Sequence, residues 1–462
     1  MSAILLRGGD LVTLDDEGSI LRRTDLLVRD GRIAAIGEAA TTDPEVAAAL
    51  ERGTAGEELE VVDVPRTLVL PGLVNAHCHS PMTLQRGAAE DMPFSRWLPE
   101  IWRIEKNLEP EDIYWGAALA AVEMIRSGVV AFNCMYFRME QVAAVVRASG
   151  MRAALGETVF DPGAGTEAGD VLERAVQWTA SIASDTEDPE DSEDPAAQRL
   201  RVFLAPHSPY ACSRPLLEKV VEEAHALGVG VHLHVSEDQR QVDESRRRYG
   251  TTPVQLLESI GVFEVPGGCV AAHSLVLEPR DVEILALRGV HVPHCSITYA
   301  KLAMETFPLQ PLIDAGVRLC LGTDGPASNA DMDLFAVIRH TALMQKYMAR
   351  DPTVLSGDTL LRLATRGGAE ALGFADAGVL RVGALADLIV LDADAPHLQP
   401  AHSPIANLVH SVKGSDVVHS MVGGEWLMRE REVLTLDEAE IVFEAARRGA
   451  ALLERAAGER PA

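Results

Sequence analysis

Histidine and acidic residues stand at the ends of several short apolar runs in this chain of 462 residues. His77 and His79 follow one such run, and alternate residues of a β-strand point to the same side. Their imidazoles can therefore aim at one point, and neutral imidazole is a common ligand of Zn²⁺ and related metals. Alone, the pair is equally compatible with two polar residues that end a buried strand.

A second pair, His232 and His234, is followed at a short distance by Glu237. A carboxylate beside a metal and its water can act as the general acid and base of a hydrolysis, although a lone Glu is more often a solvated loop residue. Two further runs end in His273 and Asp324. Asp324 lies in a Gly-Thr-Asp-Gly stretch, which in isolation is more often a plain turn.

These strand ends are most simply explained together by a metal ion. Burying His or Asp without a partner costs about 1–3 kcal/mol or more per group, and four such ends on one rim would add that cost repeatedly. We therefore predict one divalent ion, with Zn²⁺ as the expected metal and Fe²⁺ or Mn²⁺ as alternatives. Its predicted ligands are His77, His79, His234 and Asp324. His232 can instead be an interior histidine with its own hydrogen-bond partner.

The sequence favours one metal ion over two. Dinuclear barrel hydrolases commonly use a bridging carboxylated Lys from a middle strand, but no Lys occurs between Lys106 and Lys219. The third and fourth strands predicted below therefore cannot supply one. Glu157, on the predicted third strand, leaves a bridging carboxylate as the alternative.

Eight apolar runs alternate with helical patterns such as residues 113–126, 214–227 and 281–287. This βα alternation predicts a (β/α)8 TIM-type barrel of the α/β class, whose chemistry lies at the carboxyl ends of the strands. The predicted strands are residues 73–79, 129–137, 151–160, 201–206, 230–234, 269–273, 290–294 and 318–322.

Both ends of the chain have a β pattern. Short strands are predicted at 4–6, 11–14, 25–29, 32–36, 61–64 and 67–70, and again at 388–391, 417–422 and 425–428. We predict a small β-sandwich domain built from residues 1–66 and 375–436, around a barrel of residues 67–374. Residues 437–462 are predicted to be a C-terminal helix packed on the outside.

The net charge of −28, from 41 Lys and Arg against 69 Asp and Glu, argues against a nucleic-acid partner. No apolar stretch reaches the ~18 residues of a membrane-spanning helix, and the N-terminus lacks a secretory signal pattern. The six cysteines are widely spread without a Cys-x-x-Cys pair, which is typical of reduced thiols. We predict a cytoplasmic protein without a membrane partner. The acidic segment 184–195 is predicted to be a solvated surface loop, with cation binding as the less favoured alternative.

Four stretches together resemble the amidohydrolase superfamily, and within it the 5-methylthioadenosine/S-adenosylhomocysteine deaminase family. They are residues 71–87, 207–210, 232–237 and 322–329, with further similarity at 383–388, so that the resemblance runs over nearly the whole chain. It implies that the predicted ligand set holds Zn²⁺. It also implies that Glu237 shuttles protons and contacts the heterocycle, and that His273 holds the attacking hydroxide or the tetrahedral centre.

The resemblance further implies substrate-binding residues. His207 would contact the nucleoside, although a polar strand end satisfied by its own loop is the alternative, and Glu105 falls near the ribose-binding Glu of the family. Two positions depart from the family pattern. Residues 294–302 remodel the loop after the seventh strand and place Tyr299 near the expected pocket, and Glu157 stands where some homocysteine-accepting members carry Arg. A carboxylate there would disfavour S-adenosylhomocysteine.

The predicted function is hydrolytic deamination of an adenosine-type nucleoside or related amino-heterocycle, with release of ammonia. Asp324 or His273 would accept the proton of water while Glu237 protonates the ring nitrogen. A triazine or pterin aminohydrolase or chlorohydrolase is the alternative on the same barrel, and a catalytically silent binding protein is the alternative of another class. The partner is a small molecule, and the chain is expected to form a homo-oligomer. An apolar pocket can be shaped by Met82, Met135, Met304, Phe94, Trp97 and Trp102, although ordinary packing is the commoner role of such residues.

Overall fold

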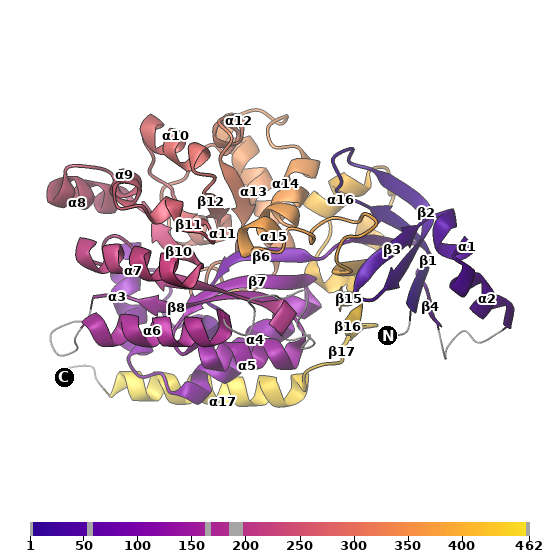
Figure 1. Ribbon diagram of the computed structural model, residues 1–462, viewed down its shortest axis with the longest axis horizontal. Helices are drawn as coiled ribbons and strands as arrows, with labels where there is room; N and C mark the ends of the chain where they lie inside the picture. The colour runs from indigo at the N-terminus through magenta and orange to yellow at the C-terminus, as the bar shows by residue number, and fades with distance from the viewer. Residues whose placement is uncertain (1–2, 53–58, 162–167, 184–196, 459–462) are drawn as a thin grey trace.

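Eight apolar runs form the parallel strands of a barrel in the computed structural model of the chain (Figure 1). The structure describes residues 3–52, 59–161, 168–183 and 197–458. Nearly every strand residue is buried, because helices cover the outer face of the barrel and side chains fill its interior. In order the strands are β6 (Leu73–Cys78), β7 (Val129–Tyr136), β8 (Arg152–Val159), β9 (Leu200–Pro206), β10 (Gly230–Val235), β11 (Cys269–His273), β12 (His291–His294) and β13 (Arg318–Leu321).

Helices follow the strands, as the alternating pattern predicts. Helix α7 has the predicted bounds, whereas α4 begins three residues before the predicted 113 because Glu109 and Asp112 form a capping box around its first turn. Two extra elements follow β6, η1 (Ser80–Gln85) and α3 (Phe94–Glu105). The other helices of this region are α4 (Pro110–Arg126), α5 (Met139–Ser149), α6 (Ala168–Ala183), α7 (Arg214–Leu227), α8 (Gln239–Tyr249), α9 (Pro253–Ser259), α10 (Pro279–Leu287), α11 (Ser296–Lys301), α12 (Gln310–Asp314), α13 (Leu334–Ala349), α14 (Gly357–Leu363) and α15 (Arg366–Leu372).

The first and last barrel strands meet at a seam. The backbone N–H of Asp324 donates to the carbonyl oxygen of His77 over 3.0 Å. The Asn75 amide bridges the same seam, accepting from the Thr323 N–H at 3.0 Å and donating to the Thr323 hydroxyl at 2.7 Å. These bonds place Asp324 beside the end of β6, although the two residues are far apart in the sequence.

Both ends of the chain contribute to a second, mixed sheet, seen in Figure 1 where indigo and yellow segments lie together at the right. The prediction of a barrel with a small β domain from both chain ends is confirmed. The domain boundaries stay a prediction, and β5 pairs with β1 and β14 of this sheet. The strands are β17 (Glu432–Val433), β16 (Glu425–Arg429), β15 (Val417–Val422), β14 (Leu388–Asp392), β5 (Thr67–Pro71), β1 (Ala3–Val12), β2 (Ile20–Arg29), β3 (Arg32–Ile36) and β4 (Leu59–Asp63).

The N-terminal region differs from its prediction in two ways. The two strands predicted at 4–6 and 11–14 are the single strand β1, which accommodates a register shift around Gly9 in its pairing with β2. Two helices that the strand pattern did not predict follow β3, namely α1 (Glu38–Thr42) and α2 (Pro44–Arg52). Asp30 and Gly31 join β2 to β3, and both residues have the positive φ of a tight hairpin turn, 51° and 73°.

The helix α17 (Glu438–Ala457) runs along the barrel beneath α4 in Figure 1. Arg448 pairs with Glu109 at 3.2 Å and Arg455 pairs with Asp112, so the helix is fixed to the start of α4. A short helix, α16 (Pro404–His410), lies in the C-terminal region between β14 and β15. Within the described ranges, no helix is both long and apolar enough to cross a membrane. The acidic segment 184–195 lies outside the described residues.

Candidate active site

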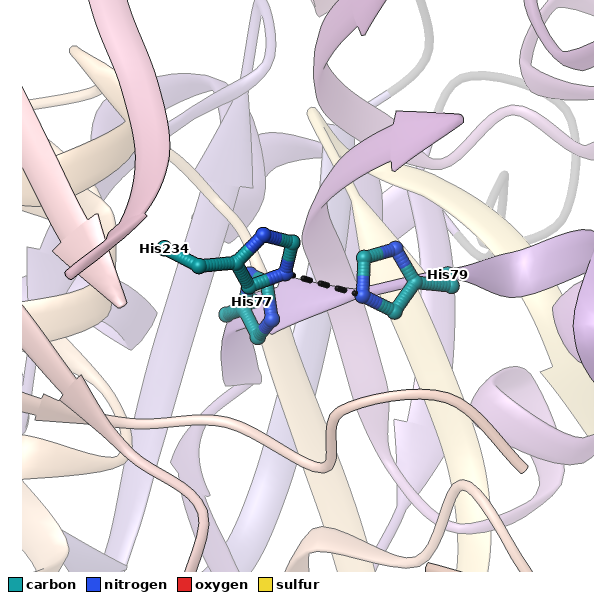
Figure 2. A group of neighbouring side chains, drawn as sticks. All are labelled: His77, His79 and His234. Atoms are coloured by element: carbon teal, nitrogen blue, oxygen red, sulfur yellow. Dashed lines mark hydrogen bonds between the residues drawn. The ribbon is translucent and has the colours of Figure 1, made fainter. Parts of the chain in front are cut away.

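The strand ends bring the predicted metal ligands to one point at the barrel mouth. His77 lies on β6 and His79 just after it, His234 lies on β10, and Asp324 follows β13. Nε2 of His79 lies 3.3 Å from Nε2 of His234, the contact drawn in Figure 2. Oδ1 of Asp324 lies 3.5 Å from Nε2 of His77 and 3.3 Å from Nε2 of His79. The donor atoms form two groups that could hold a metal ion and that share His77: one with His79 and His234, the other with His273 and Asp324.

The other ring nitrogen of each of these three histidines is already bound. Nδ1 of His79 contacts the Met135 carbonyl oxygen at 2.7 Å, and Nδ1 of His234 contacts the His207 carbonyl oxygen at 2.9 Å. Nδ1 of His77 lies 2.9 Å from Nε2 of the buried His232. Each Nε2 therefore faces the common point, which is the usual arrangement of metal-binding histidines. His232 has the interior role that the sequence left open.

The donor set fits a divalent transition metal. Nε2 of His77 is buried and has no hydrogen-bond partner in the described structure, which a metal ion would satisfy. Burial lowers the pKa of His77 and of His234, so both imidazoles are neutral as metal binding requires. Burial opposes the charge on His79 as well, but the hydrogen bond and charge of Asp324 raise its pKa to about 9.

Asp324 is held ionised and in one orientation. Burial favours its neutral form, but the close imidazoles of His77 and His79 hold its pKa well below the usual range. The Ser328 hydroxyl donates to Oδ2 at 2.9 Å, which leaves Oδ1 facing the imidazoles. Gly322 is required nearby, because a Cβ atom there would lie 2.9 Å from the His77 carbonyl oxygen. The Gly-Thr-Asp-Gly stretch is thus a close approach of two strands rather than a plain turn.

His273 ends β11 and stands beside the predicted ligands. Its ring stacks on that of His234, with centroids 5.3 Å apart, and it belongs with His77 and Asp324 to a second group of converging donor atoms. Burial lowers the pKa of His273 to about 3, so the ring is neutral. Tyr299 lies behind it, with the phenol oxygen 3.3 Å from Nδ1 of His273. The remodelled loop therefore supports His273, and Tyr299 does not itself line the cavity.

Glu237 follows β10 and faces the same cavity. Burial, and then the charges of Asp324 and Asp238, raise the pKa of its carboxyl group to about 8. The Tyr210 hydroxyl contacts Oε1 at 3.3 Å, and the Glu237 backbone N–H donates to the Gln241 side chain at 2.9 Å. A buried carboxyl group of this kind is protonated at neutral pH and can act as a general acid.

A cavity of about 650 Å³ opens above these groups. Its inner end is polar, and the aromatic residues of α3 form one apolar wall. All six residues named above as possible pocket residues line it: Met82, Met135, Met304, Phe94, Trp97 and Trp102. The cavity is large enough for a nucleoside-sized molecule.

The two predicted substrate-binding residues also line this cavity. His207 follows β9; burial lowers its pKa to about 3, and its Nδ1 lies 3.1 Å from the Ser208 hydroxyl. Glu105 ends α3, and its Oε1 accepts a hydrogen bond from Tyr136 at 2.6 Å. Burial raises the pKa of Glu105 to about 7.

Glu157 lies on β8, the predicted third strand, but its carboxylate contacts the start of α5. Its carboxylate oxygens accept the backbone N–H groups of Arg138 and Met139, at 3.1 and 2.8 Å, where α5 begins. It is not among the described residues that line the cavity. The prediction that this carboxylate disfavours S-adenosylhomocysteine therefore loses its structural basis, and so does a bridging role between two metal ions.

Sequence reasoning assigned no role to several polar residues at the site. Tyr136 is the last residue of β7 and Gln85 the last of η1, and both belong to the hydrogen-bond network of Glu105. Ser328 and Tyr210 contact Asp324 and Glu237. Tyr136 carries the same signal as the histidines, a polar residue at a strand end. Gln85 gives no signal in the sequence.

Comparison with known proteins agrees with this geometry. The family model described as "Amidohydrolase family" matches residues 68–427. A 5-methylthioadenosine/S-adenosylhomocysteine deaminase of Pelotomaculum thermopropionicum is 39% identical, over 98% of this chain and 100% of its own length. A 5'-deoxyadenosine deaminase of Methanosarcina acetivorans is 36% identical, over 99% and 100%.

Solved structures are similar over the same span. An adenosine deaminase from Xanthomonas campestris with bound zinc matches with a TM-score of 0.86 and 32% identity, covering 98% of this chain and 99% of that chain. Family model, relatives and fold therefore agree over nearly the whole length. The chain belongs to the amidohydrolase family and is a hydrolase that acts on carbon–nitrogen bonds.

Proposed function

We propose that this enzyme deaminates adenosine-type nucleosides, replacing the exocyclic amine of the purine by oxygen from water and releasing ammonia. One observation carries the proposal: a buried carboxyl group, Glu237, faces a cluster of histidine and aspartate donors in a nucleoside-sized cavity. An acid beside an activated water is what addition to an amidine-like ring carbon requires. The similarity to two nucleoside deaminases and a zinc-containing adenosine deaminase supports the same reaction.

The metal ligands in this proposal are His77, His79, His234 and Asp324. One divalent ion would bind there. The set of three imidazoles and one carboxylate favours Zn²⁺, with Fe²⁺ or Mn²⁺ as alternatives. When bound, such an ion supplies Lewis acidity and lowers the pKa of water from about 15.7 toward about 7.

The protein side chains then handle the protons. Glu237 donates its proton to the ring nitrogen next to the carbon that water attacks, which neutralises the charge developing on the ring. Neutral His273 can hold the added oxygen by a hydrogen bond, and its own orientation is fixed by Tyr299. Asp324 accepts the proton of water, and that proton leaves with the amine. As the amine leaves, the ring nitrogen returns its proton to Glu237, so nucleoside and water give the hydroxyl form of the nucleoside and ammonia.

The cavity would hold the nucleoside along its length. Glu105 would receive the ribose hydroxyls and His207 would contact the nucleoside, as predicted from the family resemblance. The wall of Phe94, Trp97 and Trp102 favours an apolar substituent at the 5' position. Burying a methylthio group against it is favourable, whereas burying a hydroxyl group without a hydrogen-bond partner costs free energy.

The compartment and assembly belong to the same proposal. All six cysteines are buried and unpaired, which supports a reducing compartment such as the cytoplasm. Leu343 and Tyr347 expose 55% and 85% of their surface on α13, which supports self-association into a homo-oligomer.

The test is ammonia release by the purified enzyme from a panel of amines. We expect turnover of adenosine, 5'-deoxyadenosine and 5'-methylthioadenosine, with loss of activity after chelation and recovery on adding Zn²⁺. A pterin amine, an aminotriazine and a chlorotriazine are the comparison substrates. Release of chloride from the chlorotriazine with no ammonia from any nucleoside, or full activity in verified metal-free enzyme, would contradict the proposal.

A further inference from the structure

A chain of three polar side chains lies beside the apolar wall of the cavity. The Gln85 amide donates to the Tyr136 oxygen at 2.8 Å, and the Tyr136 hydroxyl donates to Oε1 of Glu105 at 2.6 Å. When Glu105 is ionised its carboxylate can only accept, so the Tyr136 hydroxyl then donates to Glu105 while its oxygen accepts from the Gln85 amide. The donor and acceptor of each of these two hydrogen bonds are therefore fixed.

The three residues come from three separate elements that meet here. Gln85 ends η1, Tyr136 ends β7 and Glu105 ends α3. Gln85 is fully buried, while Tyr136 and Glu105 line the cavity. A glutamate side chain has three rotatable bonds, so its carboxylate needs a fixed partner to keep one orientation. Tyr136 occupies one acceptor position of Oε1, and a carboxylate offers about four such positions, so others remain for a bound molecule.

Electrostatics agree with this arrangement. Burial raises the pKa of Glu105 to about 7, and the hydrogen bonds from Tyr136 and Gln85 oppose that rise. An O–H donor at the carboxylate favours its ionised form, which is the stronger hydrogen-bond acceptor. The chain of donors thus maintains an acceptor in an otherwise apolar part of the cavity.

We infer that Tyr136 is a positioning residue for the ribose diol: it holds the Glu105 carboxylate in the orientation that receives the 2' and 3' hydroxyls, and Gln85 holds Tyr136. The inference rests on the proposed function, which assigns the ribose to Glu105. The amine to be removed lies at the other end of the nucleoside. Tyr136 therefore affects the binding of the sugar and not the rate of the deamination step.

The experiment compares Tyr136→Phe with wild type on two substrates, adenosine and 2',3'-dideoxyadenosine, which lacks both hydroxyls. For Tyr136→Phe we expect KM for adenosine to rise about 10-fold, as for a weakened hydrogen bond to a charged group, with kcat within about 3-fold of wild type. KM for the dideoxy analogue should not change. Gln85→Met, which removes the next donor in the chain, should shift KM for adenosine in the same direction by less. Tyr114→Phe, on α4 outside the cavity, is the matched control and should leave both substrates unaffected.

Glu105→Gln separates this inference from the proposed function. Suppose that Glu105→Gln raises KM for adenosine but not for the dideoxy analogue. If Tyr136→Phe then leaves both KM values unchanged, or raises both equally, the inference is overturned and the ribose assignment stands. If Glu105→Gln also fails to distinguish the two substrates, both are overturned. Thermal melting of each variant confirms that the protein compared is folded.

Discussion

The Glu237 carboxyl group shows how one residue is prepared for its chemistry by its surroundings. Burial and two neighbouring carboxylates, Asp324 and Asp238, raise its pKa to about 8. Tyr210 and Gln241 hold the residue in place through its side chain and its backbone. The group therefore carries a proton at neutral pH while Asp324, a short distance away, stays ionised. Two carboxyl groups in one cavity thus have opposite roles.

The raised pKa of Glu237 makes kcat depend on pH. The acid needs its proton, so kcat should fall as the pH rises through about 8, or somewhat below it once a nearby cation favours the ionised form. Glu237→Gln should lower kcat by about 10²–10⁴-fold and lose this alkaline limb, because the amide does not titrate. Steady-state assays from pH 5 to 10 measure both effects.

The control is Glu258→Gln, a partly exposed carboxylate of α9 that pairs with Arg288. Its kcat and pH profile should match wild type. An unchanged alkaline limb in Glu237→Gln would show that another group carries the proton.

Individual residues of the site were predictable to different degrees. His77, His79, His234 and Asp324 were predictable because a buried strand that ends in a polar residue is costly without a partner. The partners of the Glu157 carboxylate were not predictable, because they depend on how the first residues of the preceding helix α5 lie against the end of β8. Tyr299 was expected near the pocket, and only the fold shows that it lies behind His273.

Among the elements, the barrel and the end sheet are joined by a buried ion pair. Arg152 on β8 contacts Asp387 just before β14, with Nε and Oδ2 2.6 Å apart and side chains that are only 6% and 2% exposed. Asp387 also accepts the backbone N–H of Gly423 at 2.8 Å. Removing one member of such a pair leaves the other charge buried without its counterpart.

We expect Asp387→Ala to lower the free energy of unfolding by about 3–5 kcal/mol, measured by denaturant titration. Asp63→Ala removes the exposed pair with Arg7, whose side chains are 42% and 63% exposed, and should change stability by about 1 kcal/mol or less. Equal effects of the two substitutions would show that burial of the Arg152–Asp387 pair does not matter.

The elements were predictable to different degrees. The barrel strands were predictable because each is a nearly continuous apolar run between helical patterns, as in β10. The single strand β1 was not, because the polar and glycine residues in its middle resemble a turn and only pairing with β2 carries the strand through them. The helices α1 and α2 were missed because they are short and lie between strands.

In the whole molecule, the barrel brings together residues that are distant along the chain. The closing contacts between β6 and β13 set His77 beside Asp324, across an interval of nearly 250 residues. The sequence predicts this convergence only through the barrel itself, since no local pattern joins the two residues. The exact lining of the cavity required the structure, because α3 and η1 are insertions whose course no repeat dictates.

The central claim is that these distant side chains hold one divalent ion. The direct measurement is elemental analysis of the enzyme after loading with Zn²⁺ and removal of unbound metal. The account predicts about one ion per chain in wild type and in His402→Ala, which alters an exposed histidine far along the chain, and well under one in His79→Ala and Asp324→Ala. Full metal content in both of those ligand variants would contradict it.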